Sequence, residues 1–383
     1  MKSLIAVTLI GITLSFFQVI NAKVINLPKQ FEKEQPIVGK LFSNKSIGLL
    51  RKNTNNKYIY TLKTSSESVA ITLPWKPTHL ESNAKNNVMV FASLKLNGHS
   101  NSKSKLDVFK GNFKSMSLDN VEYFKITGNG ERLFVIRNSE GVVTNELFDL
   151  EGNLITTKNW GKINNTRSMA FSLSNDGMLF LPRPQSPDIE TWTSIKSFSG
   201  SNYETELKYE FEGERVYDGL AINENKIVLI VERMLMAFDG TNFMWSFSPK
   251  YLNIRLTSLA PSDDGEYIIA TDTDSNSFYV LDTFGKVVLE HSDSLNHANA
   301  ERLNFLPSRK KIRGASYSRS YNIRNGYLII QDETLKKLFV IDLTTQKHKV
   351  LPANKSLLDV APELNKIINR SGNLVKKDSI FID

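Results

Sequence analysis

The sequence predicts an all-β protein, a β-propeller of four-stranded blades. An imperfect repeat of roughly 40 to 50 residues runs from Pro36 to the C-terminus. In each copy a short apolar strand ends in a polar turn. The pattern is clearest in residues 171–177 (FSLSNDG) and 259–265 (LAPSDDG), and weaker in residues 124–130 (FKITGNG) and 220–225 (LAINEN). A repeat of this length made of strands and turns is typical of a propeller, with one blade per copy.

The first 22 residues have the pattern of a secretory signal peptide. Lys2 supplies a positive charge, residues 4–20 are mostly apolar, and Ala22 is a suitable cleavage residue. We expect a signal peptide over residues 1–22 and a single propeller domain over residues 23–383. An uncleaved membrane anchor is the alternative, although the apolar run is short for a membrane span.

The chain has no cysteine. Exported eukaryotic domains usually carry disulfides, so a large exported chain without them indicates a bacterial periplasm or secretion. The absence also excludes a lipoprotein anchor, a cysteine nucleophile and thiolate metal ligands. The formal net charge is +8. It favours anionic partners such as phosphorylated glycans or a membrane surface, whereas export makes nucleic acid an unexpected partner.

The strands fall into eight blocks, each with an apolar inner strand, two further strands and a polar outer strand. The blocks begin near Pro36, Thr78, Val121, Thr166, Arg215, Arg255, Glu301 and Lys355. Block six is the most regular, with strands predicted over residues 256–261, 267–271, 278–282 and 287–291. We therefore expect eight four-stranded blades, with seven as the alternative.

Two residue types recur in register with the blocks. Aspartates end the predicted third strands at positions 149, 239, 282 and 342. An aspartate there can accept hydrogen bonds from backbone N–H groups two residues on. Trp75, Trp160 and Trp245 are spaced by 85 residues, which is two blades. We expect their rings to fill the wedge between neighbouring blades.

The two ends of the chain are expected to close the ring. The last block, residues 355–383, has room for only three strands, and residues 24–27 (VINL) form a spare strand before the first block. Pairing the spare strand with the last block would remove an open sheet edge.

Residues 281–285 (LDTFG) and 243–247 (FMWSF) resemble the blade ending of the eight-bladed quinoprotein-like (PQQ-like, WD40-like) superfamily. Members of that superfamily that use pyrroloquinoline quinone combine a disulfide of adjacent cysteines with calcium. Its outer-membrane assembly lipoprotein is anchored through a cysteine. This chain has no cysteine, so the resemblance implies a fold and a compartment but not an activity.

No metal, cofactor or catalytic site is expected from the residue pattern. The five histidines do not occur at HxH or HxxxH spacing, and there is no GxSxG elbow or phosphate-binding glycine loop. Residues 272–276 (DTDSN) alternate like a calcium loop, but they fall where the blade requires a hairpin, and polar turn residues explain them.

An insertion over residues 307–324 is predicted between the first and second strands of block seven. It holds the densest basic and aromatic set of the chain, which comprises Arg309, Lys310, Lys311, Arg313, Tyr317, Arg319, Tyr321 and Arg324. Arginine, lysine and tyrosine together can hold phosphate or sulfate and stack on rings. We interpret these residues as a candidate partner-binding site, with a solvated loop as the alternative.

The sequence thus predicts a monomeric, non-catalytic binding or scaffolding propeller that holds a protein or an anionic glycan through its loops. The alternative is a propeller enzyme, such as a hydrolase, lyase or quinoprotein, whose residues converge in the central channel. Several carboxylates or histidines at one mouth of the channel would favour the enzyme, and apolar or Ser/Thr side chains there would favour the scaffold.

Overall fold

The fold is described from a computed structural model. It describes residues 24–26 and 36–376, with gaps at 43–45, 65–67, 74, 84–85, 95–103, 141, 163–170, 183–192, 201, 224, 251–253, 263, 273–276, 293–302, 304–305, 307–318, 333–334, 353–356, 362–365 and 370–373.

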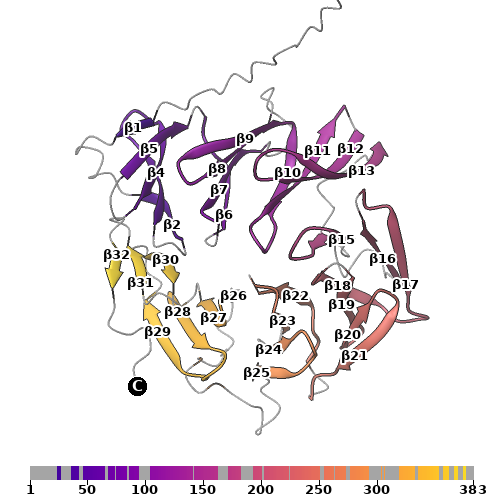
Figure 1. Cartoon of the computed structure of the whole chain (residues 1–383). Helices are drawn as coiled ribbons and strands as arrows, with labels where there is room; N and C mark the ends of the chain where they lie inside the picture. Colours follow the sequence, from indigo (N-terminus) through magenta and orange to yellow (C-terminus); the bar gives the residue numbers. More distant parts are fainter. Residues whose placement is uncertain are drawn as a thin grey trace, which may run out of the picture.

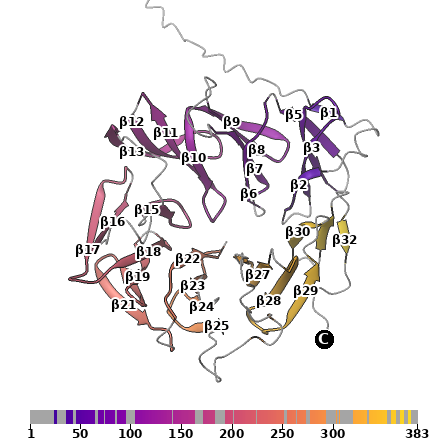
Figure 2. The ribbon, with the colours of Figure 1, turned by 180° about the vertical axis from the view of Figure 1, so that it is seen from behind.

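Antiparallel sheets stand in a ring around a central axis (Figures 1 and 2), and each sheet runs from an inner to an outer strand. The inner strands are β2 (Pro36–Leu41), β6 (His79–Asn83), β10 (Val121–Ile126), β14 (Phe171–Leu173), β18 (Val216–Ala221), β22 (Ser258–Pro261), β26 (Arg319–Arg324) and β30 (Leu357–Ala361). The second strands are β3 (Ile47–Lys52), β7 (Val88–Ser93), β11 (Arg132–Ser139), β15 (Leu179–Pro182), β19 (Lys226–Val231), β23 (Tyr267–Asp272), β27 (Tyr327–Asp332) and β31 (Lys366–Asn369).

The third strands are β4 (Tyr58–Lys63), β8 (Lys105–Lys110), β12 (Val142–Asp149), β16 (Ser194–Ser199), β20 (Met234–Asp239), β24 (Ser277–Asp282), β28 (Lys337–Asp342) and β32 (Leu374–Lys376). The outer strands are β5 (Ser68–Leu73), β9 (Phe113–Asp119), β13 (Leu154–Lys162), β17 (Thr205–Glu210), β21 (Asn242–Phe247), β25 (Val287–His291) and β29 (His348–Pro352), and β1 (Val24–Asn26) lies outside β5.

The protein is an all-β propeller with seven complete four-stranded blades, the number that the sequence left as the alternative. The remaining sheet, β30–β31–β32, has three strands in the described part of the chain. It corresponds to the last sequence block, for which only three strands were predicted. The prediction of eight complete blades is therefore wrong, although seven of the eight predicted block starts lie within a few residues of an inner strand.

The predicted pairing of the two chain ends is also wrong. Strand β1 pairs with β5, with Val24 opposite Ile71 and Asn26 opposite Val69, and so adds a fifth strand to the first sheet. Both β5 and the last sheet offer an open edge, and a strand pattern alone does not select between them. The β5 edge belongs to the sheet that the chain enters next. The last sheet instead meets the first through β30, which lies beside β2.

The insertion in block seven has different bounds from those predicted. Residues Arg319–Arg324 form β26, the inner strand of the seventh sheet. The long connection therefore runs from β25 to β26, between two sheets, instead of between the first and second strands of one sheet. The sequence predicts the start of this block near Glu301, whereas its inner strand begins at Arg319, almost 20 residues later.

The core is a series of interfaces between neighbouring sheets. In one of them Leu220 and Val228 of the fifth sheet pack with Leu259 and Ile268 of the sixth, and all four side chains are buried. Five other clusters join the remaining neighbours from the first sheet to the seventh. Strands buried on both faces read as continuous apolar runs, which accounts for the inner-strand pattern in the sequence.

Tryptophans fill the widening outer part of these interfaces, as predicted. The Trp245 indole N–H donates to the carbonyl of Thr283 in the next sheet at 3.2 Å, and its ring lies against Gly285. Trp160 makes an edge-on contact with Phe198 of the next sheet, with 5.1 Å between ring centroids.

The repeated turn after the inner strand has one hydrogen-bond pattern. The Ser174 hydroxyl donates to Asp176 Oδ1 at 2.6 Å and accepts the N–H of Leu179 at 2.8 Å, while the Gly177 N–H donates to the Ser174 carbonyl at 2.9 Å. Gly177 has φ of 79°, a conformation that favours glycine. The same bonds recur in residues 127–132 and 262–267.

Three of the four aspartates predicted to end third strands accept the expected hydrogen bond, and for Asp239 the prediction is not confirmed. Asp149 Oδ1 accepts the N–H of Glu151 at 3.0 Å, Asp282 Oδ1 that of Phe284 at 2.9 Å, and Asp342 Oδ1 that of Thr344 at 2.8 Å. These bonds fix the turn between third and outer strands.

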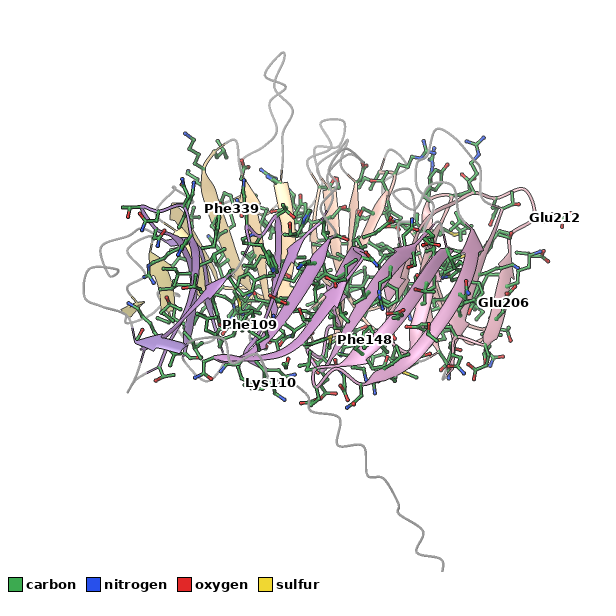
Figure 3. All side chains as sticks on the ribbon, turned by 90° about the horizontal axis from the view of Figure 1, so that it is seen from above. Phe109, Lys110, Phe148, Glu206, Glu212 and Phe339 are labelled. Carbon is green, nitrogen blue, oxygen red and sulfur yellow. The ribbon has the colours of Figure 1, made fainter. Side chains whose placement is uncertain are left out.

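The disc has two faces. Inner and third strands both end at one of them, which we call the first-turn face because it carries the turns at residues 127–131, 174–178 and 262–266. Figure 3 shows the disc edge-on, with Lys110, the last residue of β8, near this face and Glu212, just after β17, near the other. In the described ranges no helix is long and apolar enough to cross a membrane.

Candidate functional site

A pocket of about 290 Å³ opens in the central channel at the first-turn face. Its walls are the ends of inner strands β2, β6, β10, β14, β18 and β22 and the first turns that follow them. The six strands come from sheets that stand around the axis in Figure 1. No two of them are close in sequence, so only the closed ring brings their residues together.

Three charged side chains line the pocket, one from each of three successive sheets. They are Lys40 near the end of β2, Glu81 in β6 and Lys125 near the end of β10. Their signs alternate around the wall, and the two lysines outnumber the carboxylate. This part of the pocket is therefore positively charged.

Glu81 has two roles in this wall. Its Oε2 accepts the N–H of Ile126 at 2.7 Å, which joins the second and third sheets. Burial raises the pKa of the Glu81 carboxyl, and the hydrogen bond from Ile126 and the charge of Lys125 oppose that rise. Glu81 is the one carboxylate among the residues that line the pocket.

The hydroxyl groups on the wall make hydrogen bonds within their own turns. Thr127, Ser174 and Ser262 line the pocket, and each hydroxyl donates to a side chain two residues on. Each hydroxyl oxygen also accepts a main-chain N–H from the second strand, at 3.1, 2.8 and 2.9 Å respectively. Groups held this firmly form a rigid polar rim.

Asn175 reaches across the mouth from the fourth sheet. Its amide Nδ2 donates to the carbonyl of Asp264 in the sixth sheet at 3.3 Å, passing over the fifth. Its backbone accepts from Asn129 at 3.0 Å and donates to Ile222 at 3.1 Å. Among the described residues its buried Oδ1 has no hydrogen-bond donor.

The wall opposite the charged residues is uncharged and largely apolar. It is formed by Leu173, Ala221, Ile222 and Pro261. The pocket is therefore two-sided, with ammonium and carboxylate groups on the first three sheets and apolar or hydroxyl groups on the next three.

Of the predicted partner-binding residues, the three that the structure describes do not line this pocket. Arg309, Lys310, Lys311, Arg313 and Tyr317 fall outside the described residues. The connection that contains them leaves β25 and enters β26 at the face opposite the first turns.

Three predicted site residues lie within β26. The Arg319 guanidinium Nε pairs with Asp332 at 2.9 Å, and the two side chains are 3% and 0% exposed. The buried Arg324 guanidinium donates to the Leu41 carbonyl of the first sheet at 3.3 Å, and Tyr321 packs its ring against Phe278 at 5.4 Å. These contacts give all three a structural role, and a partner contact by the basic set stays a prediction.

Sequence reasoning missed the pocket residues. Lys40, Glu81 and Lys125 are separated by 41 and 44 positions. The available signal was their common place near the ends of predicted inner strands, because the period of the repeat brings such positions to one mouth of the channel. Among the described residues, no group of three His, Asp or Glu side chains is placed to hold a metal ion.

No family model matches the sequence, and no curated protein matches it. Solved structures are similar in fold. One comes from a study of two prolyl endopeptidases and has a TM-score of 0.51 and 10% identity over 84% of this chain and 50% of that chain. This chain therefore spans about half the length of that protein. Hsv2 of Kluyvelomyces marxianus (TM-score 0.44, 8% identity, 84% and 98% covered) and Hsv2p of Kluyveromyces lactis (0.43, 10%, 83% and 97%) are less similar.

The endopeptidase comparison agrees with the sheet topology, and the chain is a β-propeller protein. Similarity at 10% identity is evidence for the fold only, because propellers host catalysis, binding and scaffolding alike. Membership of the quinoprotein-like superfamily, inferred from two short segments, is not confirmed.

Proposed function

We propose that this protein is an exported, non-catalytic binding propeller of the bacterial envelope, periplasmic or secreted, which holds an anionic glycan or a protein partner at its first-turn face. The observation that carries the proposal is the composition of the channel mouth. The wall with Lys40, Glu81 and Lys125 is positively charged. It faces hydroxyl groups that already make hydrogen bonds within their turns. Fixed polar groups beside an apolar wall are typical of binding sites.

The proposed compartment rests on the sequence. Residues 1–22 have the order of a signal peptide, and the chain has no cysteine. The +8 formal charge supports an anionic partner, because net charge of one sign attracts partners of the other.

Glu81 favours the enzymatic alternative. A carboxyl group whose pKa burial has raised is suited to act as a general acid. Catalysis by a propeller would need a second group to activate water or substrate. The three wall hydroxyls each accept a main-chain N–H, which makes them poor nucleophiles. Binding is therefore the better supported function.

The test is affinity capture from an envelope fraction, followed by sugar analysis and protein mass spectrometry of what is retained. The matched variants are Lys40→Met with Lys125→Met, which removes the pocket cations, and Lys286→Met, which removes an exposed cation from the same face. We expect an acidic glycan or protein to be retained by the wild type and by Lys286→Met and lost by the double variant. Equal retention by all three proteins would contradict the proposal.

A further inference from the structure

We propose that the channel-mouth pocket binds a small anion that carries hydroxyl groups, a sugar acid or a sugar phosphate, with Lys40 and Lys125 holding the anionic group. The ligand is a free sugar or the end unit of a glycan. This inference rests on the proposed function, because it names the chemistry of the ligand at the same site.

The first argument is the charge of the wall. Lys40 and Lys125 stand on either side of Glu81 in three successive sheets. One Glu81 oxygen is already bound by the Ile126 N–H at 2.7 Å, and within the described part of the chain Lys40 has no acidic partner. Two ammonium groups facing one partly used carboxylate leave a net positive site. A ligand with one or two negative charges neutralises it.

The second argument is the unfilled acceptor on the facing side. Asn175 Oδ1 is buried, and no donor reaches it from the described residues. A buried acceptor without a donor costs free energy, and a ligand hydroxyl at the pocket would satisfy it. A simple anion such as sulfate has no hydroxyl that could donate to this oxygen, and dianionic phosphate has only one. The ligand therefore combines an anionic end with hydroxyl groups.

The third argument is size and polarity. A cavity of about 290 Å³ is at the lower end of the range for small-molecule sites. It accommodates one sugar unit. Leu173, Ile222 and Pro261 offer an apolar surface to the C–H face of a sugar ring, while its hydroxyls point to the polar rim.

The experiment is isothermal titration of the full chain with four probes: glucuronate, glucose 6-phosphate, glucose and inorganic phosphate. We expect the first two to bind at least tenfold more tightly than glucose or phosphate alone, since a hydrogen bond to a charged group is worth about tenfold or more. Lys125→Met and Lys40→Met should each weaken glucuronate binding at least tenfold. Lys286→Met, at the rim of the same face, should leave it unchanged.

Each of the other possible results would contradict one part of the proposal. Equal binding of glucose and glucuronate would remove the role of the lysines, and phosphate binding as tight as glucose 6-phosphate would remove the role of the hydroxyls. Absence of binding by every probe would refute the pocket as a sugar-acid site, while envelope capture would still test the proposed function separately. If Lys40→Met fails to fold, Lys125→Gln provides the same charge removal on a different sheet.

Discussion

Glu81 Oε2 accepts the N–H of Ile126 at 2.7 Å, so a side chain of one inner strand bonds the backbone of the next. Asp218 Oδ2 makes the equivalent bond to Leu259 at 2.7 Å, and Ser172 Oγ to Ala221 at 3.0 Å. Each bond crosses from one sheet to its neighbour beside the channel, where the interface is narrowest. These polar side chains thus join neighbouring sheets, and Glu81 also lines the pocket.

Glu81→Gln should change the pH dependence of stability. The folded-state pKa of Glu81 lies above its ordinary value of 4.5, so its stabilising contribution is complete below that pH and is lost as pH rises through the folded-state pKa. Glutamine keeps the acceptor for Ile126 and cannot ionise. Thermal unfolding should show the stability of the variant increasing relative to that of the wild type as the pH rises above 4.5. Glu131→Gln, an exposed control on the same face, should show no such trend. A difference that does not vary with pH would refute the assigned ionisation.

Gly285→Ala should destabilise the protein more than Gly240→Ala. Both glycines have positive φ, 84° and 57°, so alanine carries about 1 kcal/mol of backbone strain at either position. A Cβ at Gly285 would lie 2.6 Å from Trp245 Cδ2, whereas nothing lies within 4 Å of one at Gly240. Overpacking adds about 1–3 kcal/mol. Urea unfolding measures the difference, and in a Trp245→Ala background it should disappear. Equal costs in the wild-type background would mean that Trp245 does not fill the wedge.

Removal of residues 1–27 should have a small effect on stability. Strand β1 adds only a three-residue edge pairing to β5, so we expect the melting temperature to fall by less than about 3 °C. Removal of residues 1–38 also deletes half of inner strand β2 and should lower the melting temperature by more than about 10 °C. Similar losses for the two truncations would instead support ring closure by β1.

The local parts of the fold could be predicted from the sequence. The Ser174–Gly177 turn and the Asp149 turn depend on residues within six positions of one another, so their hydrogen bonds follow from composition and order. The long-range parts could not. Strand β1 could occupy any open edge, and its pairing with β5 depends on the assembled ring.

The candidate site was hidden for the same reason. Lys40, Glu81 and Lys125 are ordinary residues near strand ends, and only the stacking of their sheets makes them one wall. Conversely, some of the basic residues that cluster in the sequence are buried and cannot contact a partner. Arg319 forms a buried ion pair with Asp332. The clustering of basic residues in the sequence therefore overestimates the number that can bind a partner.

The basic residues outside the described ranges still carry a testable expectation. Changing Arg309, Lys310, Lys311 and Arg313 to Ser should reduce the salt sensitivity of partner capture if they meet an anionic partner, because exposed charges are screened over about 8 Å at physiological ionic strength. Envelope capture across a salt series measures this. Unaltered capture and an unaltered salt response would identify the segment as a solvated connection.

Binding without turnover is the central claim, and mass spectrometry of the captured ligand tests it most directly. The purified partner or glycan is incubated for a day with a small amount of wild-type protein, of Glu81→Gln, or of the Lys40→Met and Lys125→Met double variant. The account predicts an unchanged ligand mass in all three, with retention lost only in the double variant. A new product that forms with the wild type and not with Glu81→Gln would contradict it and establish the propeller as an enzyme.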